Sequence, residues 1–139
     1  KKLNLKNDKI ENYYTHSHNL GIVPKDLNKL QNKIFGIECN FEELNGIDFK
    51  KGCYVGQENT ARIKLKNKLS KRLIPIKILE GDVKIDEEIK NQDEIVGKIL
   101  IDGKYPFALL NLKKIKLDSS QVLNTNKAKI KMIINSYLL

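Results

Sequence analysis

The chain has 139 residues, which suits one modest domain or a small domain with an appendage. Its formal charge of +9 raises nucleic acid as a partner, but Arg62 and Arg72 are the only arginines among its 26 basic residues. Because arginine makes the characteristic bidentate contacts to phosphates and bases, an excess of lysine indicates a solvated surface instead, and direct nucleic-acid binding is not expected.

The two cysteines, Cys39 and Cys53, form no CxxC pair. A disulfide framework is therefore not indicated, reduced thiols are expected, and we assign no metal ligands. No apolar run approaches the ~20 residues that a membrane-spanning helix needs, so a membrane partner is not expected. The N-terminus carries no signal-peptide pattern.

The first predicted element is a helix that begins at Asp8 and ends at Gly21. Asp8 can cap it with Glu11 in the reciprocal position of a capping box. One face of this helix is expected to pack against the rest of the protein, and it carries Ile10, Tyr13, Tyr14 and Ser17.

His16 and His18 lie near the end of this helix. Side chains that are two residues apart on a helix point in directions about 200° apart. The two histidines would therefore make a poor pair of metal ligands. We predict that both histidines are surface residues. After them, Pro24 suits the start of a second short helix with an apolar stripe at Leu27, Leu30 and Ile34, and residues 34–49 are predicted to be irregular.

The segment with the clearest site chemistry is Lys51-Gly52-Cys53-Tyr54-Val55-Gly56-Gln57-Glu58. Its two glycines leave the backbone free to take positive φ or to pass close to a ligand. Cys53 is the candidate reactive group, because a thiol beside Lys51 and close to a predicted helix start near Gly56 is favoured as thiolate. The alternative is a buried, inert cysteine.

Basic residues accumulate after this segment, since no acidic residue lies between Glu58 and Glu80. Ile63-Lys64-Leu65-Lys66 alternates apolar and basic residues, as a strand does. Such a basic strand beside a ligand site could attract a polyglutamyl tail or RNA, or it could simply be solvated.

The remainder of the chain is predicted to be β. Apolar runs at 73–79, 95–101, 105–112 and 128–134 are separated by turn signals, among them Asp102-Gly103, which is typical of a hairpin. Four to six short antiparallel strands close most economically into a small barrel. We place the boundary in front of this barrel near Asn67.

The segment from Asp48 to Glu58 resembles the signature of the YgfZ family of folate-binding proteins. That family includes a mitochondrial iron–sulfur cluster assembly factor and, more distantly, the glycine-cleavage T-protein, an aminomethyltransferase. The family pattern is F-x-K-G-C-Y-x-G-Q-E, and every fixed position of it is met by residues 49–58. Upstream, Gly21-Ile22-Val23-Pro24 resembles the G-I-P turn of the family, and Glu38-Cys39-Asn40 resembles its P-x-E-x-N stretch.

The resemblance implies an α+β protein. Residues 1–67 would be the C-terminal part of an aminomethyltransferase-like folate-binding fold, and residues 68–139 a C-terminal antiparallel β-barrel. Because members of the family carry a folate-binding half before the signature, we interpret the chain as a C-terminal portion with an incomplete pocket. The implied location is bacterial cytoplasm, or the mitochondrial matrix in a eukaryote.

The resemblance also implies a function and the residues that serve it. The protein would be a folate-binding accessory factor that supports iron–sulfur cluster assembly or repair, with assembly proteins or client enzymes as partners and tRNA modification as one downstream process. Cys53 would be the functional thiol and Lys51 its helper. Tetrahydrofolate would be the cofactor, bound by Glu38, Asn40, Tyr54, Gln57, Glu58 and Arg62.

Two alternatives remain at this point. The first is a tetrahydrofolate-dependent enzyme like the T-protein, against which the cysteine in the signature stands. The second is an RNA-binding module built on the basic strand and the barrel. That module would lack aromatic residues at alternating strand positions for base stacking.

Overall fold

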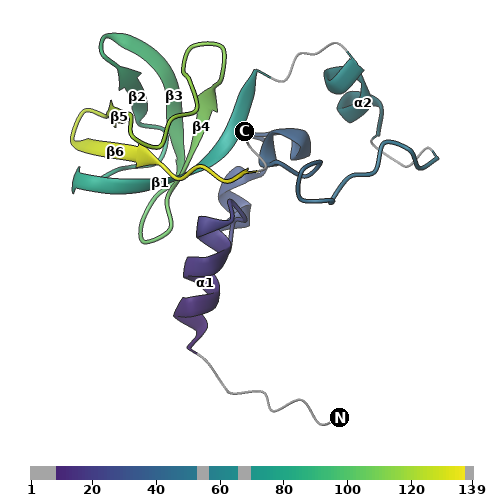
Figure 1. Ribbon diagram of the computed structural model, residues 1–139, viewed down its shortest axis with the longest axis horizontal. Coiled ribbons are helices and arrows are strands. Elements are labelled where there is room, and N and C mark those ends of the chain that lie inside the picture. Colours follow the sequence, from purple (N-terminus) through teal and green to yellow (C-terminus); the bar gives the residue numbers. More distant parts are fainter. Residues whose placement is uncertain (1–8, 53–56, 66–69, 137–139) are drawn as a thin grey trace.

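The computed structural model describes residues 9–52, 57–65 and 70–136. These residues form helix α1 (Ile10–Asn19), the 3-10 helices η1 (Leu27–Leu30) and η2 (Gly36–Cys39), helix α2 (Gln57–Leu65) and six strands. The strands are β1 (Lys71–Gly81), β2 (Glu88–Asn91), β3 (Glu94–Ile101), β4 (Phe107–Asn111), β5 (Val122–Asn124) and β6 (Ala128–Met132). In Figure 1 the strands form a barrel, α1 projects from one side of it, and α2 lies apart from it.

The strands close into an antiparallel barrel in the order β1-β4-β3-β2-β5-β6, which confirms the barrel predicted from the sequence. β1 closes it, because residues 71–75 pair with β4 and residues 76–81 pair with β6. Pro75 lies where β1 changes from one partner strand to the other. Proline has no N–H to donate, and at this position neither hydrogen-bond ladder continues through it. The predicted hairpin at Asp102-Gly103 is also confirmed, with Gly103 at φ 83° between β3 and β4.

The barrel interior is apolar. The side chains alternate along each strand, so every second residue points inward and is buried. The interior cluster contains Ile74, Ile76, Ile89, Val96, Ile99, Leu110, Leu123, Ile130 and Met132, among others. Burying one such side chain contributes about 1.5–3 kcal/mol, so this cluster is the main source of stability in the described chain.

The outer face of β1, β3 and β4 carries a second apolar cluster, formed by Leu73, Leu100, Ile101, Phe107 and Leu109. The segment that precedes the signature covers this cluster. Leu30 of η1 is buried in it, and Val23, Ile34 and Cys39 pack against it. Residues upstream of the predicted boundary therefore complete the packing of the barrel, whereas Asn67 itself lies outside the described residues.

Helix α1 confirms the first predicted helix, and Gly21 ends it at φ 73°. Its predicted packing face was wrong in part, because Ile10 and Tyr13 are exposed, whereas Ser17 is buried. The N-cap is Lys9, without a side-chain cap, and Asp8 lies outside the described residues. The prediction that both histidines are exposed was wrong for His18, which is 6% exposed. The His18 ring packs edge-on against Phe107 at 5.0 Å, and its Nε2 donates to the Pro106 carbonyl at 2.9 Å.

The predicted basic strand at 63–66 was also wrong, because residues 57–65 form α2. A four-residue alternation is short, and Gln57, Glu58 and Ala61 ahead of it are good helix formers, so the helix extends through it. Two further local predictions need adjustment. The helix expected from Pro24 is only the 3-10 turn of η1 behind Asp26. Strands β2 and β5 were not predicted because they are only four and three residues long.

Candidate functional site

The candidate site is the signature segment, which the structure describes on both sides but not in its centre. Lys51 and Gly52 are exposed, whereas Cys53, Tyr54 and residues 55–56 lie outside the described residues. Gly52 has no positive φ, and no described atom lies within 4 Å of the position that a Cβ would occupy. Within the described chain, a side chain at position 52 would therefore meet neither strain nor collision.

Helix α2 begins at Gln57, as predicted from the signature, and Glu58 lies in its first turn. The first N–H groups of a helix have no intrahelical partner and carry partial positive charge. The end of the signature therefore leads into a helix terminus that favours an anion. Glu58 and Arg62 are exposed on α2, and the side chain of Gln57 is not described.

Glu38, one of the predicted folate ligands, is half-buried in η2. Its Oε2 accepts a hydrogen bond of 2.9 Å from the Phe35 N–H. This contact caps the 3-10 turn, so one carboxylate oxygen is engaged locally.

Asn40, another predicted folate ligand, is fully buried and adopts a left-handed backbone conformation at φ 62°. Its Nδ2 donates to the Leu73 carbonyl at 2.9 Å, and its Oδ1 accepts from Arg72 Nη1 at 3.1 Å. The amide therefore ties the segment before the signature to the start of β1. A role for Asn40 in folate binding stays a prediction.

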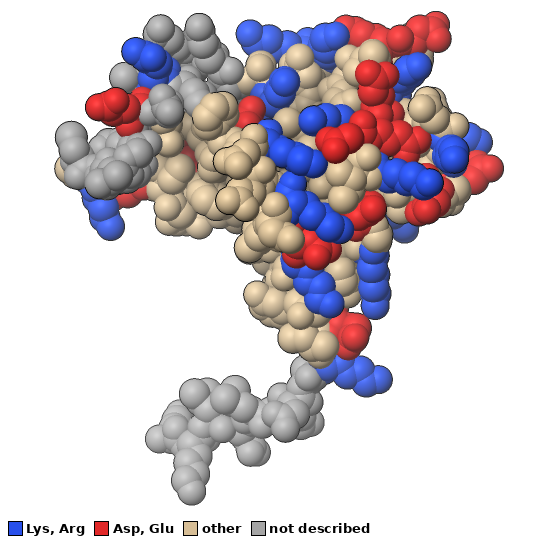
Figure 2. Space-filling view, turned by 180° about the vertical axis from the view of Figure 1, so that it is seen from behind, with Lys and Arg blue, Asp and Glu red and all other residues tan. Residues whose placement is uncertain are grey.

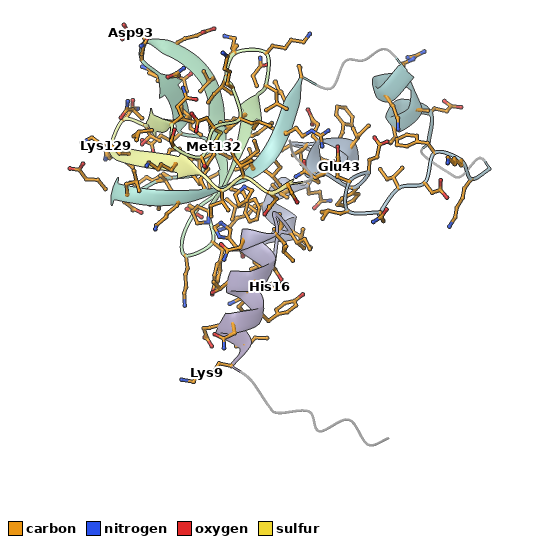
Figure 3. All side chains as sticks on the ribbon, viewed as in Figure 1. Lys9, His16, Glu43, Asp93, Lys129 and Met132 are labelled. Atoms are coloured by element: carbon orange, nitrogen blue, oxygen red, sulfur yellow. The ribbon has the colours of Figure 1, made fainter. Side chains whose placement is uncertain are left out.

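Arg72 was not assigned a role from the sequence, although it is one of only two arginines. Its guanidinium also pairs with Oε1 of Glu43, and both side chains are largely buried. Burial disfavours the charged form of Glu43, but the Arg72 guanidinium outweighs it and holds the carboxyl pKa below its usual value. In Figure 3 Glu43 lies beside the start of β1, in the segment that leads towards α2.

Lys64, near the end of α2, was predicted from the sequence only as part of a basic strand. Its Nζ pairs with the carboxylate of Glu42 and lies 3.9 Å from the centroid of the Phe49 ring. Lys64 therefore joins the helix that follows the signature to the segment that precedes it.

The described residues contain no group of His, Cys, Asp and Glu side chains that could hold a metal ion. Cys39 is a free thiol in the outer apolar cluster. Burial, with a smaller contribution from the Glu38 carboxylate, raises the pKa of Cys39 to about 11. This cysteine is therefore suited to packing and not to nucleophilic chemistry.

Comparison with curated proteins identifies relatives that share this region. The mitochondrial iron–sulfur cluster assembly factor IBA57 homologue of Dictyostelium discoideum is 33% identical over 105 residues, which are 72% of this chain. The homologues from Aspergillus oryzae and Scheffersomyces stipitis are each 39% identical, over 45% and 48% of this chain. The chain is a homologue of these assembly factors.

The shared region is a limited part of each relative. The chain spans about a quarter (26%) of the Dictyostelium discoideum protein, and 14% and 13% of the two fungal proteins. No family model matches the chain. Among the described helices, none is both long and apolar enough to cross a membrane.

Proposed function

We propose that this chain is part of a folate-binding accessory protein that supports iron–sulfur cluster assembly or repair. The observation that carries the proposal is the 33% identity over 105 residues with an iron–sulfur cluster assembly factor. Because the named relatives are mitochondrial proteins, we place a eukaryotic protein of this kind in the mitochondrial matrix. Its partners would be iron–sulfur assembly proteins or client enzymes.

In this proposal Cys53 is the functional thiol. Exposed Lys51 and the start of α2 support it, because both favour a nearby thiolate. The assignment of tetrahydrofolate as the cofactor rests on the family signature, and we retain its proposed contacts: Glu38, Asn40, Tyr54, Gln57, Glu58 and Arg62. Since Asn40 already bonds Leu73 and Arg72, its contribution would be to hold the signature in place.

The distribution of exposed apolar side chains supports a further covering portion of the protein, such as the aminomethyltransferase-like part implied by the signature. Among the described residues, three large exposed apolar side chains lie on the barrel and its strands: Leu79, Ile95 and Val122. Seven lie in α1 or between α1 and the signature, namely Ile10, Tyr13, Leu20, Ile22, Leu27, Phe35 and Phe41. Uncharged surface gathers in Figure 2 around α1 and beside the barrel.

A chimeric protein tests the proposed function. The homologous region of the Scheffersomyces stipitis factor would be replaced by this chain and expressed in a fungal strain that lacks its own factor. We expect the chimera to restore the activity of mitochondrial iron–sulfur enzymes and the Cys53→Ser chimera to fail at equal protein level. His16→Gln, at an exposed position on α1, is the matched control.

Two results would count against the proposal. A chimera that accumulates in mitochondria without restoring any iron–sulfur enzyme would refute the function. Full activity of the Cys53→Ser chimera would refute the thiol assignment alone. Calorimetry with tetrahydrofolate tests the cofactor separately, and we expect binding by the chimera but weak or no binding by the isolated chain, which offers one wall of a pocket that normally buries ~70–90% of its ligand.

A further inference from the structure

One hollow of the described chain lies at the end of the barrel where α1 joins it. Its volume of about 440 Å³ is within the usual range of small-molecule pockets. Its walls come from parts of the chain that are distant in sequence: the end of α1, the middle of β1, the loop between β3 and β4, and Ile133 directly after β6. No residue of the signature is among the described residues that line it.

Aromatic contacts fix α1 against the β3–β4 loop and so hold the hollow open. The His18 ring packs edge-on against Phe107 at 5.0 Å and lies 5.7 Å from the Tyr105 ring. Its Nε2 donates to the Pro106 carbonyl at 2.9 Å. Tyr14, one turn earlier on α1, packs edge-on against Tyr105 with the ring centroids 5.9 Å apart. The two sides of the hollow are therefore joined by several contacts and not by one.

The inner surface of the hollow suits an organic group. The rings of His18 and Tyr105 line one side of it. The rest of the inner surface is apolar and buried or half-buried, formed by Ile76, Ile78, Pro106 and Ile133. A flat ring placed there buries apolar surface, which contributes about 25 cal/mol per Å², and it meets aromatic neighbours at their edges or faces.

The rim of the hollow is positively charged. Lys77 of β1 and Lys104 of the β3–β4 loop line it, and the described lining residues include no Asp or Glu. Lys131 of β6 lies directly opposite Lys77 in the sheet register, so the two side chains share one face of the sheet. Like charges directly opposite each other destabilise a sheet, and a bound anion would relieve this repulsion.

The carboxylates closest to this rim do not neutralise it. Asp102, at the start of the β3–β4 loop, pairs with Lys29 at 3.0 Å. Asp118 acts on Lys131 through space, and the two form no ion pair. Within the part of the chain that the structure describes, three lysines at the hollow take part in no ion pair: Lys77, Lys104 and Lys131.

We propose that this hollow binds a small organic phosphate that carries a flat ring, with the phosphate between Lys77 and Lys104 and the ring against Tyr105 and the apolar inner surface. Lysine binds phosphate as a point charge. A phosphate monoester carries a charge of about −1.5 to −2 at pH 7, which two lysines match and which a single carboxylate does not reach. The site is separate from the proposed function, because it uses neither the signature nor the proposed folate contacts.

The test is an NMR titration of the full chain with AMP as the probe. His16 and His18 are the only histidines, so their ring signals are assigned by comparison with His16→Gln. We expect a saturable shift of the His18 signals, and no shift of the signals of His16, which is exposed on α1 and does not line the hollow. Adenosine and inorganic phosphate, which each keep half of the ligand, should bind about fivefold more weakly or less well still.

Lysine variants separate a built site from attraction by net charge. Lys77→Met and Lys104→Met should each weaken AMP binding about fivefold or more, and Lys77→Arg, which keeps the charge, should bind within about twofold of the native chain. Lys116→Met removes the same charge at an exposed lysine in the loop after β4, and it should leave the affinity unchanged. Both rim lysines are exposed, so these variants should fold, which the His18 signals without ligand will show.

Four results would overturn the proposal. The first is the absence of a saturable His18 shift with AMP in the native chain. The second is an equal loss of affinity in Lys116→Met and the two rim variants, which would mean attraction by net charge alone. The others are adenosine binding as tightly as AMP, which would exclude the phosphate contact, and inorganic phosphate binding as tightly as AMP, which would exclude the contact with the ring.

Discussion

Replacing Asn40 by alanine should be among the more destabilising single changes in the segment before the signature. The substitution removes both hydrogen bonds of the buried amide, to the Leu73 carbonyl and from Arg72. Leu73 lies in the part of β1 that pairs with β4 and not with β6, so its carbonyl relies on Asn40. Leaving buried partners unsatisfied costs about 1–3 kcal/mol.

The backbone adds a second cost. Asn40 has φ 62°, and an L-residue with a Cβ at this conformation costs roughly 1–2 kcal/mol, a cost that asparagine reduces by local hydrogen bonding. We therefore expect Asn40→Ala to lower the free energy of unfolding by about 2–4 kcal/mol. That is a large share of the ~5–15 kcal/mol typical of a native domain.

Two further variants divide this total. Asn40→Gly loses the same hydrogen bonds but adopts positive φ readily, so it should cost about 1 kcal/mol less than alanine. Asn32→Ala is the matched control for the backbone term, because Asn32 has φ 60° and an exposed side chain. It should cost only about 1 kcal/mol.

The assay is urea denaturation followed by circular dichroism, with the m-value checked for constancy. Equal losses for Asn40→Ala and Asn32→Ala would show that the buried hydrogen bonds contribute nothing. A loss of less than about 0.5 kcal/mol for Asn40→Ala would refute the whole assignment.

Three further outcomes are expected. Gly97→Ala should lower the free energy of unfolding by about 1–3 kcal/mol in the same assay, because the added Cβ would lie 2.4 Å from the Leu109 carbonyl oxygen. Gly52→Ala is the control and should leave stability unchanged, since no described atom lies near its Cβ position. Equal effects of the two substitutions would contradict the packing argument. Burial lowers the pKa of His18, and its hydrogen bond to the Pro106 carbonyl only partly opposes this. The folded state therefore binds the proton less well than the unfolded state does. The free energy of unfolding should be highest above pH 6.5 and should fall as the pH drops below that value. His18→Gln should flatten that fall between pH 7.5 and 5.5, His16→Gln should not, and an unchanged slope in His18→Gln would refute the assignment. Because the pKa of Cys39 is raised to about 11, iodoacetamide at pH 8 should label this thiol in urea but scarcely in the native protein; rapid native labelling would show that it is not buried.

Much of the barrel was determined by local sequence. The apolar and β-branched runs at 73–79, 95–101, 105–112 and 128–134, separated by turn signals, predicted four of the six described strands. Asp102-Gly103 predicted the β3–β4 hairpin, because glycine accepts the positive φ that the turn needs. The stop signal at Gly21 likewise predicted where the helix over residues 10–19 ends, whereas the predicted cap at Asp8 lies outside the described residues.

Other features depend on contacts between distant parts of the chain, which local periodicity does not predict. His18 is buried because the chain brings Pro106, 88 residues away, and Phe107 over it. Residues 63–65 are helical, since a four-residue alternation fits a strand or a helix end equally until its neighbours are placed.

The supports of the signature also belong to the tertiary structure. Asn40 finds Leu73 33 residues further along the chain, and Lys64 finds Glu42 22 residues back. A sequence pattern reports which residues share a face of one element. It carries no information on which distant side chain will lie opposite, because that depends on the path of the whole chain around the barrel.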